Sequence, residues 1–195
     1  MLLRFSKMHC LGDDLMLVEQ VSQHAHIGVA DIQRWASRVR GVGFKRLVLI
    51  EVPRTPEVDF DCRVFSCDGQ EQDCSFIELC CMVRLLRDKK LTARRQLRFS
   101  SRNGVFSTSY AGQGWVCVEY PLQGFNELQF SHGWPIELGA AAGGLLAIHQ
   151  QEQQTDGCLR LELVKSELSL SLFFARQSIE LRGWASRVYE GQIKL

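Results

Sequence analysis

Hydrophobic and polar residues alternate in short runs along much of the chain, and this pattern predicts strands. Residues that favour turns, Asn103-Gly104 and Gly112–Gly114, separate the later runs. The strands expected in the first 120 residues are Met16–Val18, Arg46–Glu51, Arg63–Phe65, Leu97–Ser100, Val105–Tyr110 and Trp115–Tyr120. After residue 150 we expect Leu159–Val164, Leu168–Phe174, Ser178–Arg182 and one more strand in the closing GWASRVYEGQIKL.

A helical period replaces this alternation in three places. Between Phe76 and Arg87 the apolar residues recur every three or four positions, which predicts an amphipathic helix. Ser75 and Glu78 stand at the two positions of a capping box at its start. A short helix is expected over Asp31–Arg40 with Asp31 as its cap, and another over Ile136–Gln151.

The composition is that of a soluble globular protein. The chain has 195 residues, of which 46% are hydrophobic and 23% charged, and its net charge is +1. Such a balance gives no overall field that would recruit nucleic acid or a membrane surface. No signal peptide and no apolar run near the roughly 20 residues of a membrane span is recognisable, so we expect a cytoplasmic protein with reduced thiols.

The stretch Arg63–Arg84, RVFSCDGQEQDCSFIELCCMVR, resembles the active-site signature N-x-D-G-S-x4-C-G-N-G-x-R of the diaminopimelate epimerase family. Three further segments are similar to that family in the same order: Lys7–Glu19, Gly41–Glu51 and Leu97–Phe106. The closing segment GWASRVYEGQIKL is similar to the last strand of the family.

The resemblance implies an α+β fold of two similar halves, each a curved sheet wrapped around a central helix. Residues 1–120 with 183–195 would form a complete N-terminal-type half. Residues 121–182 would form a truncated second half with one helix and short strands. In this family the substrate lies between the halves, and the backbone N–H groups at the helix starts bind its carboxylate.

The resemblance also implies where the reaction would take place. Each half of the family supplies one cysteine, and the two exchange the alpha proton on opposite faces of the substrate. Those positions hold Ser75 and Leu138 in this chain, and Cys74 stands one residue before the first of them. Leucine transfers no proton, and serine is a poor base without a partner. We therefore assign no catalytic residue, and we keep Cys74 as a displaced candidate.

The substrate-binding positions implied by the resemblance are changed as well. They correspond in this chain to Asp13, Arg46, Ser66, Phe76, Ile77, Glu78 and Gly139. Asp13 and Arg46 replace an asparagine and a glutamine. Phe76, Ile77 and Glu78 replace a glycine-asparagine-glycine run. Bulky residues and an acid at the helix start disfavour a carboxylate ligand.

Two other interpretations of the residues remain open at this point. Cys62, Cys67, Cys74, Cys80 and Cys81 form a cluster that could bind a metal or act in redox chemistry, although the spacing is not that of structural zinc. The basic run Arg84–Arg102 lacks the aromatic platform of single-strand binders, so we interpret it as solvated surface.

The sequence therefore predicts a catalytically degenerate relative of diaminopimelate epimerase with a binding, structural or interaction role. The first alternative is an isomerase of lysine and peptidoglycan precursor synthesis with residual or altered activity. The second is a cysteine-based metal or redox site. We expect no cofactor, no metal, no nucleic acid and no membrane. The expected partners are a second copy or another protein, with a small amino-acid-like ligand as a further candidate.

Overall fold

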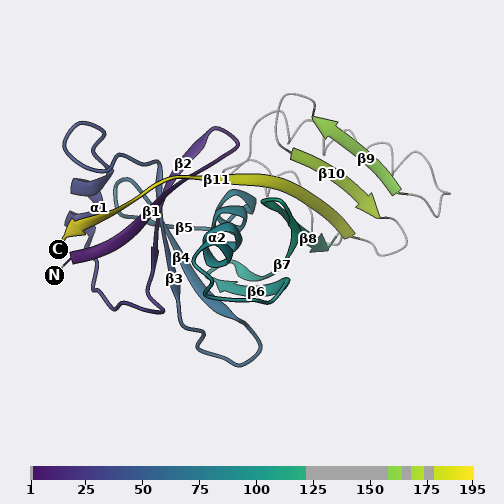
Figure 1. Ribbon diagram of the computed structural model, residues 1–195, viewed down its shortest axis with the longest axis horizontal. Helices are drawn as coiled ribbons and strands as arrows, with labels where there is room; N and C mark the ends of the chain where they lie inside the picture. Colours follow the sequence, from purple (N-terminus) through teal and green to yellow (C-terminus); the bar gives the residue numbers. More distant parts are fainter. Residues whose placement is uncertain (1, 122–157, 164–167, 174–177) are drawn as a thin grey trace.

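The computed structural model describes residues 2–121, 158–163, 168–173 and 178–195 (Figure 1). The first strands are β1 (Leu2–Cys10), β2 (Asp13–Glu19), β3 (Arg46–Glu51), β4 (Phe60–Ser66) and the two-residue β5 (Glu71–Gln72). Strands β6 (Gln96–Ser101), β7 (Gly104–Gly112) and β8 (Trp115–Pro121) follow, then β9 (Cys158–Leu163), β10 (Leu168–Phe173) and β11 (Ser178–Lys194). The two described helices are α1 (Val29–Ala36) and α2 (Phe76–Asp88).

Eight of these strands close into a mixed β-barrel. Neighbouring strands pair in the order β1, β2, β3, β4, β6, β7, β8 and β11, and β11 returns to pair with β1. The β2–β3 and β4–β6 pairs are parallel, and the other pairs of the ring are antiparallel. The long strand β11 makes closure possible, because its first part pairs with β8 and its second part with β1.

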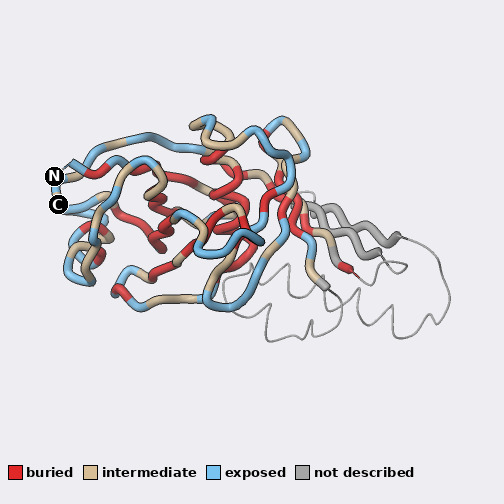
Figure 2. The backbone as a smooth tube through the Cα atoms, turned by 90° about the horizontal axis from the view of Figure 1, so that it is seen from below, coloured by how far each residue is buried: buried red, intermediate tan, exposed pale blue. Residues whose placement is uncertain are grey.

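Helix α2 contacts the strands of this barrel and is largely buried. It packs against β11, β8, β1, β7 and β2. Its residues from Phe76 to Val83 are all buried, and the apolar ones among them join apolar residues of the strands in one core (Figure 2). A second, smaller core lies between the short helix α1 and the strands, with Trp35 and Phe65 among its members. Burial of apolar area on this scale is the main driving force for the fold.

Strands β10 and β9 extend the sheet beyond the barrel from the first part of β11. Figure 1 shows this hairpin projecting away from the ring. The register pairs leucine with leucine at three alternate positions, Leu168 with Leu163, Leu170 with Leu161 and Leu172 with Leu159.

The strand predictions Arg46–Glu51, Leu97–Ser100, Val105–Tyr110 and Trp115–Tyr120 are confirmed to within a few residues. The expected helix over Asp31–Arg40 is wrong in its bounds and its cap. Helix α1 begins after Gly28, and Asp31 is three residues inside it, where its carboxylate accepts a hydrogen bond from the Gly28 N–H at 3.3 Å. The helix ends early because the Gly43 N–H binds the Trp35 carbonyl and turns the chain.

The end of the chain also differs from the prediction. The sequence predicts two separate strands, and the structure has one continuous strand, β11, across both. Gly183 lies within this strand where the Phe76 ring packs closely, since a Cβ atom there would lie 2.6 Å from Phe76 Cζ. The glycine at position 183 therefore reflects tight packing and not an interruption of the strand. The expected helix over Ile136–Gln151 lies outside the described residues.

Candidate functional site at the start of the buried helix

Ser75 is the N-cap of α2, and the predicted capping box is present. The Glu78 carboxylate accepts a hydrogen bond from the Ser75 backbone N–H at 2.8 Å and another from the Ser75 hydroxyl. The Leu79 N–H binds the Ser75 carbonyl at 3.2 Å and begins the helical hydrogen bonds. The Glu78 carboxylate thus accepts the donors of Ser75 at the helix start, where the helix dipole favours negative charge.

Arg46, on the neighbouring strand β3, neutralises this carboxylate. Arg46 Nη1 lies 2.6 Å from Glu78 Oε1, and the side chain of Glu78 is 0% exposed while that of Arg46 is 10% exposed. A buried carboxylate without a cation is strongly unfavourable, so this pair makes the burial of Glu78 tolerable.

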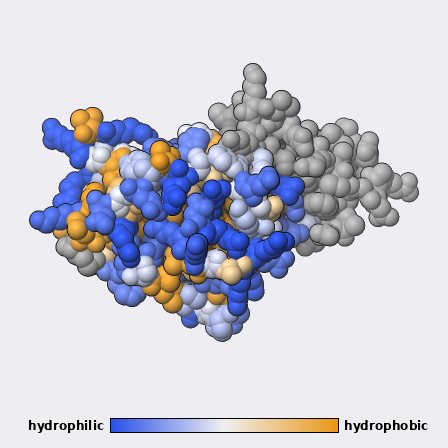
Figure 3. Space-filling view, in the orientation of Figure 1, coloured by the Kyte–Doolittle hydropathy of each residue, from blue (hydrophilic) through white to orange (hydrophobic). Residues whose placement is uncertain are grey.

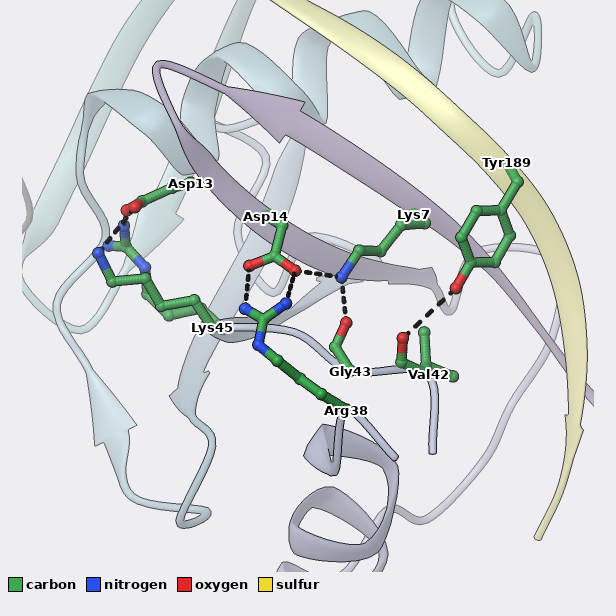
Figure 4. A network of polar contacts seen from close by, with 9 residues as sticks. Lys7, Asp13, Asp14, Arg38, Val42, Gly43, Lys45 and Tyr189 are labelled. Atoms are coloured by element: carbon green, nitrogen blue, oxygen red, sulfur yellow. Dashed lines mark hydrogen bonds and ion pairs between the residues drawn. The ribbon is translucent and has the colours of Figure 1, made fainter. Parts of the chain in front are cut away.

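Asp13 extends the pair into a row of alternating charges. It lies at the start of β2 and accepts hydrogen bonds from Arg46 Nη2 and from Lys45 Nζ, the latter at 2.7 Å. The row therefore runs Lys45, Asp13, Arg46, Glu78, and its charges cancel. Figure 4 shows Asp13 beside Lys45. The sequence analysis did not single out Lys45 as a site residue. The only indication in the sequence is that Lys45 directly precedes Arg46.

A second ionic group lies beside the first. Asp14 accepts hydrogen bonds from Lys7 Nζ at 2.6 Å and from both terminal nitrogens of Arg38 at 3.0 and 2.8 Å (Figure 4). Lys7 Nζ also donates to the Gly43 carbonyl, and this ties the loop after α1 to strand β1. Burial of Asp14 by itself would raise its pKa, but the hydrogen bonds from Arg38 and Lys7 outweigh burial and lower the pKa from 3.8 to about 2.

The other predicted binding positions are distributed as follows. Phe76 and Ile77 are buried in the core of the barrel. Ser66 stands opposite Arg46 in the β3–β4 register, and its hydroxyl donates to Asp68 at the turn after β4. Of these positions, the structure brings Arg46 into direct contact with both Asp13 and Glu78. Leu138 and Gly139 lie outside the described residues.

Cys74, the displaced candidate for proton transfer, is buried immediately before the N-cap. Its contact with Cys62 raises its thiol pKa well above the ordinary value, and burial raises it further. A thiol of raised pKa is a weak nucleophile and metal ligand at neutral pH. Within the described residues no group of three or more His, Cys, Asp and Glu side chains could hold a metal ion.

Asn103 is a second residue that the sequence did not single out. Its side-chain oxygen accepts from the Cys74 N–H and its side-chain nitrogen donates to the Cys74 carbonyl, both at 3.0 Å. The sequence predicted only a turn at Asn103-Gly104. Hydrogen bonds from a side chain to backbone groups 29 positions away leave no local pattern in the sequence.

The described cavities lie elsewhere. One of about 880 Å³ is lined by residues such as Arg98, Ser107 and Glu119, and one of about 720 Å³ by residues such as His24 and Phe65. Neither includes Asp13, Arg46, Ser75 or Glu78 in its lining. No described helix is long and apolar enough to cross a membrane.

Comparison with solved structures shows the class of fold. A phenazine biosynthesis protein of the PhzF family from Enterococcus faecalis aligns over 100% of both chains with a TM-score of 0.65 and 10% identity. A hydroxyproline epimerase from Agrobacterium vitis aligns over 100% of this chain and 93% of its own, with a TM-score of 0.66 and 9% identity. The chain therefore has the mixed-barrel fold of the PhzF and proline-racemase-like proteins.

Comparison of amino-acid sequences identifies the relatives of this chain within that class of fold. A diaminopimelate epimerase from Pseudomonas paraeruginosa is 35% identical over 185 residues, which cover 85% of this chain and 62% of that protein. One from Pseudomonas entomophila is 41% identical over 124 residues, covering 61% of this chain and 43% of that protein. No protein-family model matches the chain. This chain is a homologue of the diaminopimelate epimerases, and it spans less than two thirds of the length of these two relatives.

Proposed function

We propose that the chain is a catalytically degenerate relative of diaminopimelate epimerase, which uses the fold for binding or assembly and not for epimerisation. One observation carries the proposal: the Glu78 carboxylate, paired with Arg46 at 2.6 Å, lies at the start of α2. The resemblance implies that this is where a substrate carboxylate would bind. Glu78 already accepts the Ser75 N–H, so it competes with a ligand for that donor.

The chemistry of the neighbouring residues supports the same proposal. Epimerisation through two bases needs a titratable group on each face of the substrate. Ser75 donates its hydroxyl proton to Glu78 and caps the helix. Cys74 is buried and its pKa is raised, so it makes a poor base at neutral pH. An isomerase with residual or altered activity is the alternative, and the homology to diaminopimelate epimerases favours it.

The decisive measurement is proton exchange at the alpha carbon. Purified protein is incubated with stereopure diaminopimelate in deuterated water, and deuterium uptake is followed by mass spectrometry. We expect no uptake above the protein-free control. Uptake that is abolished by Cys74→Ala and retained by Cys67→Ala would overturn the proposal and establish residual isomerase activity through the displaced cysteine.

We propose association with a second copy as the binding role. The support is the register of β9 with β10, which pairs leucine with leucine at three alternate positions of the two strands. Soluble monomers seldom expose large contiguous apolar areas, and a twofold dimer is the most frequent way to cover one. On the face shown in Figure 3, the coloured residues include hydrophobic ones only in small separate groups among hydrophilic ones. Sedimentation at micromolar concentration tests this: a monomer that binds no hydrophobic dye would contradict it.

A further inference from the structure

A groove of about 880 Å³ lies on the outside of the barrel, over β6, β7, β8 and β11. Alternation along the strands shows which face this is. Leu97, Val118 and Leu181 belong to the core around α2. A chain neighbour of each of them lines the groove instead, and successive side chains of a strand point to opposite faces. These groove residues are Arg98, Glu119 and Glu180.

Strand pairing places the charged residues of this outer groove in one row. Arg98 of β6 pairs with Ser107 of β7, and Ser107 pairs in turn with Glu119 of β8. Glu119 then pairs with Glu180 of β11. Neighbouring strands are about 4.8 Å apart, so Arg98 and Glu119, which are two strands apart, have backbones about 10 Å apart. The row therefore has a cation at one end, a hydroxyl beside it and two carboxylates at the other end.

The cationic end of the outer groove has more positive charge than the protein itself neutralises. Three arginines line this end, Arg94, Arg95 and Arg98. Asp59 accepts a hydrogen bond from Arg94 Nη1 and another from the Arg98 backbone N–H, the latter at 2.8 Å. Among the described residues, the side chains of Arg95 and Arg98 have no partner in a hydrogen bond or ion pair. Two guanidinium groups are therefore available to an anion.

The acidic end has the opposite imbalance. Arg182 Nε lies 3.8 Å from Glu180 Oε1, so Glu180 has a cation nearby. Glu119 is exposed, and among the described residues its carboxylate has no partner in an ion pair. It also stands directly opposite Glu180 in the register, an arrangement of like charges that is unfavourable by itself. A cation placed at Glu119 would relieve this repulsion.

We propose that the outer groove binds a short zwitterionic peptide, with its carboxylate at Arg95 and Arg98 and its ammonium group at Glu119. An extended tripeptide is about 10 Å long, which matches the spacing of the two ends. Guanidinium groups bind a carboxylate through paired N–H donors, and a carboxylate accepts the donors of an ammonium group. The hydroxyl of Ser107 is available to the peptide backbone between them.

The charges of the outer groove argue against simpler ligands. A ligand with negative charge throughout would meet Glu119 and Glu180, and one with positive charge throughout would meet the arginines. The volume of the groove lies within the range of small-molecule sites, about 300–1,000 Å³. The basic run Arg84–Arg102, which we interpreted as solvated surface, thus supplies one end of this site.

The test compares three peptides on the native chain: trialanine, its N-acetyl derivative, which lacks the ammonium group, and its C-terminal amide, which lacks the carboxylate. Dissociation constants come from ligand-observed NMR titrations at neutral pH and low salt. We expect trialanine to bind more tightly than either derivative by about two- to fivefold, the effect of one exposed ion pair. Equal binding of the three peptides, or binding of none, would overturn the inference.

Variants then test where each end of the peptide binds. Arg98→Gln should weaken trialanine binding and remove the preference for trialanine over the amide. Glu119→Gln should instead remove the preference over the N-acetyl derivative. Arg40→Gln and Glu190→Gln remove exposed charges outside the groove and should leave all three constants unchanged. Binding that neither groove variant alters would place the peptide elsewhere and overturn the inference. None of these outcomes depends on whether the protein catalyses epimerisation.

Discussion

Arg46 Nη1 lies 2.6 Å from Glu78 Oε1, and the Glu78 side chain has no exposure to solvent. The same guanidinium reaches Asp13 through its other terminal nitrogen, so a single arginine holds together β2, β3 and the start of α2. The start of α2 therefore already holds a carboxylate that belongs to the chain itself.

Replacing Arg46 by Ala should destabilise the protein by about 3–5 kcal/mol, because the buried Glu78 carboxylate loses its cation. Urea unfolding monitored by tryptophan fluorescence measures the change. Lys45→Ala is the matched control: Lys45 binds the same Asp13 but its side chain is 58% exposed, so the loss should stay within about 1 kcal/mol. Equal effects in the two variants would contradict the assignment of Arg46 as the partner that stabilises Glu78.

Removal of the Glu78 carboxylate should create a small anion site. In Glu78→Ala, the Arg46 guanidinium and the Ser75 N–H lose their shared acceptor. Added sodium formate should then raise the unfolding midpoint of the variant more than that of the parent chain. Sodium chloride at equal ionic strength controls for screening. If formate acts equally on parent and variant, the carboxylate does not occupy a ligand-like position.

Ser75→Ala should cost about 0.5–2 kcal/mol through loss of the cap. Ser75→Asp, usually an acceptable cap residue, should be destabilising here, because the Ser75 hydroxyl donates to the Glu78 carboxylate and an aspartate would bring a second negative charge there. Ser75→Thr keeps a hydroxyl and should be close to the parent in urea unfolding. An aspartate variant as stable as the parent would show that Glu78 is not held near the cap.

Asp14 should contribute to the acid sensitivity of the fold. Its folded-state pKa is lowered from 3.8 to about 2, so its stabilisation is fully present above pH 4 and is lost as the pH falls from about 4 to 2. Because Arg38 is well exposed, we expect a contribution of only about 1 kcal/mol. Asp14→Asn should remove this part of the pH dependence in unfolding titrations, whereas Asp31→Asn, a control on the α1 surface, should leave it. An unchanged slope in Asp14→Asn would refute the assignment.

Gly183→Ala should destabilise the protein by about 1–3 kcal/mol through overpacking, because the new methyl would lie 2.6 Å from the Phe76 ring. Phe76→Leu in the same chain should recover part of the loss, since it shortens the side chain that the methyl would meet. Gly104→Ala tests backbone strain at a position where a Cβ meets no atom within 4 Å. Additive effects of Gly183→Ala and Phe76→Leu would show that the two positions do not share this contact.

The sequence by itself determined the local elements and the start of α2. Alternation predicted β6, β7 and β8, and the apolar run LVLIE predicted β3. The three-and-four spacing predicted α2, and Ser75 with Glu78 predicted its capping box. All of these depend on residues close together in the chain. The stretch Arg63–Arg84 also indicated the homology, which the comparisons confirmed.

Only the tertiary structure decided what the changed residues do. Asp13 and Arg46 are 33 positions apart, and nothing local to either predicts that they meet. From the sequence, Glu78 and Asp13 looked like charges that would repel an anion, yet folding the barrel places Arg46 between them and makes the site neutral. Closure of the ring by β11 likewise depends on pairing with β1 at the far end of the chain. These contacts depend on strand pairing and burial between distant parts of the chain, so a local pattern of residue types does not predict them.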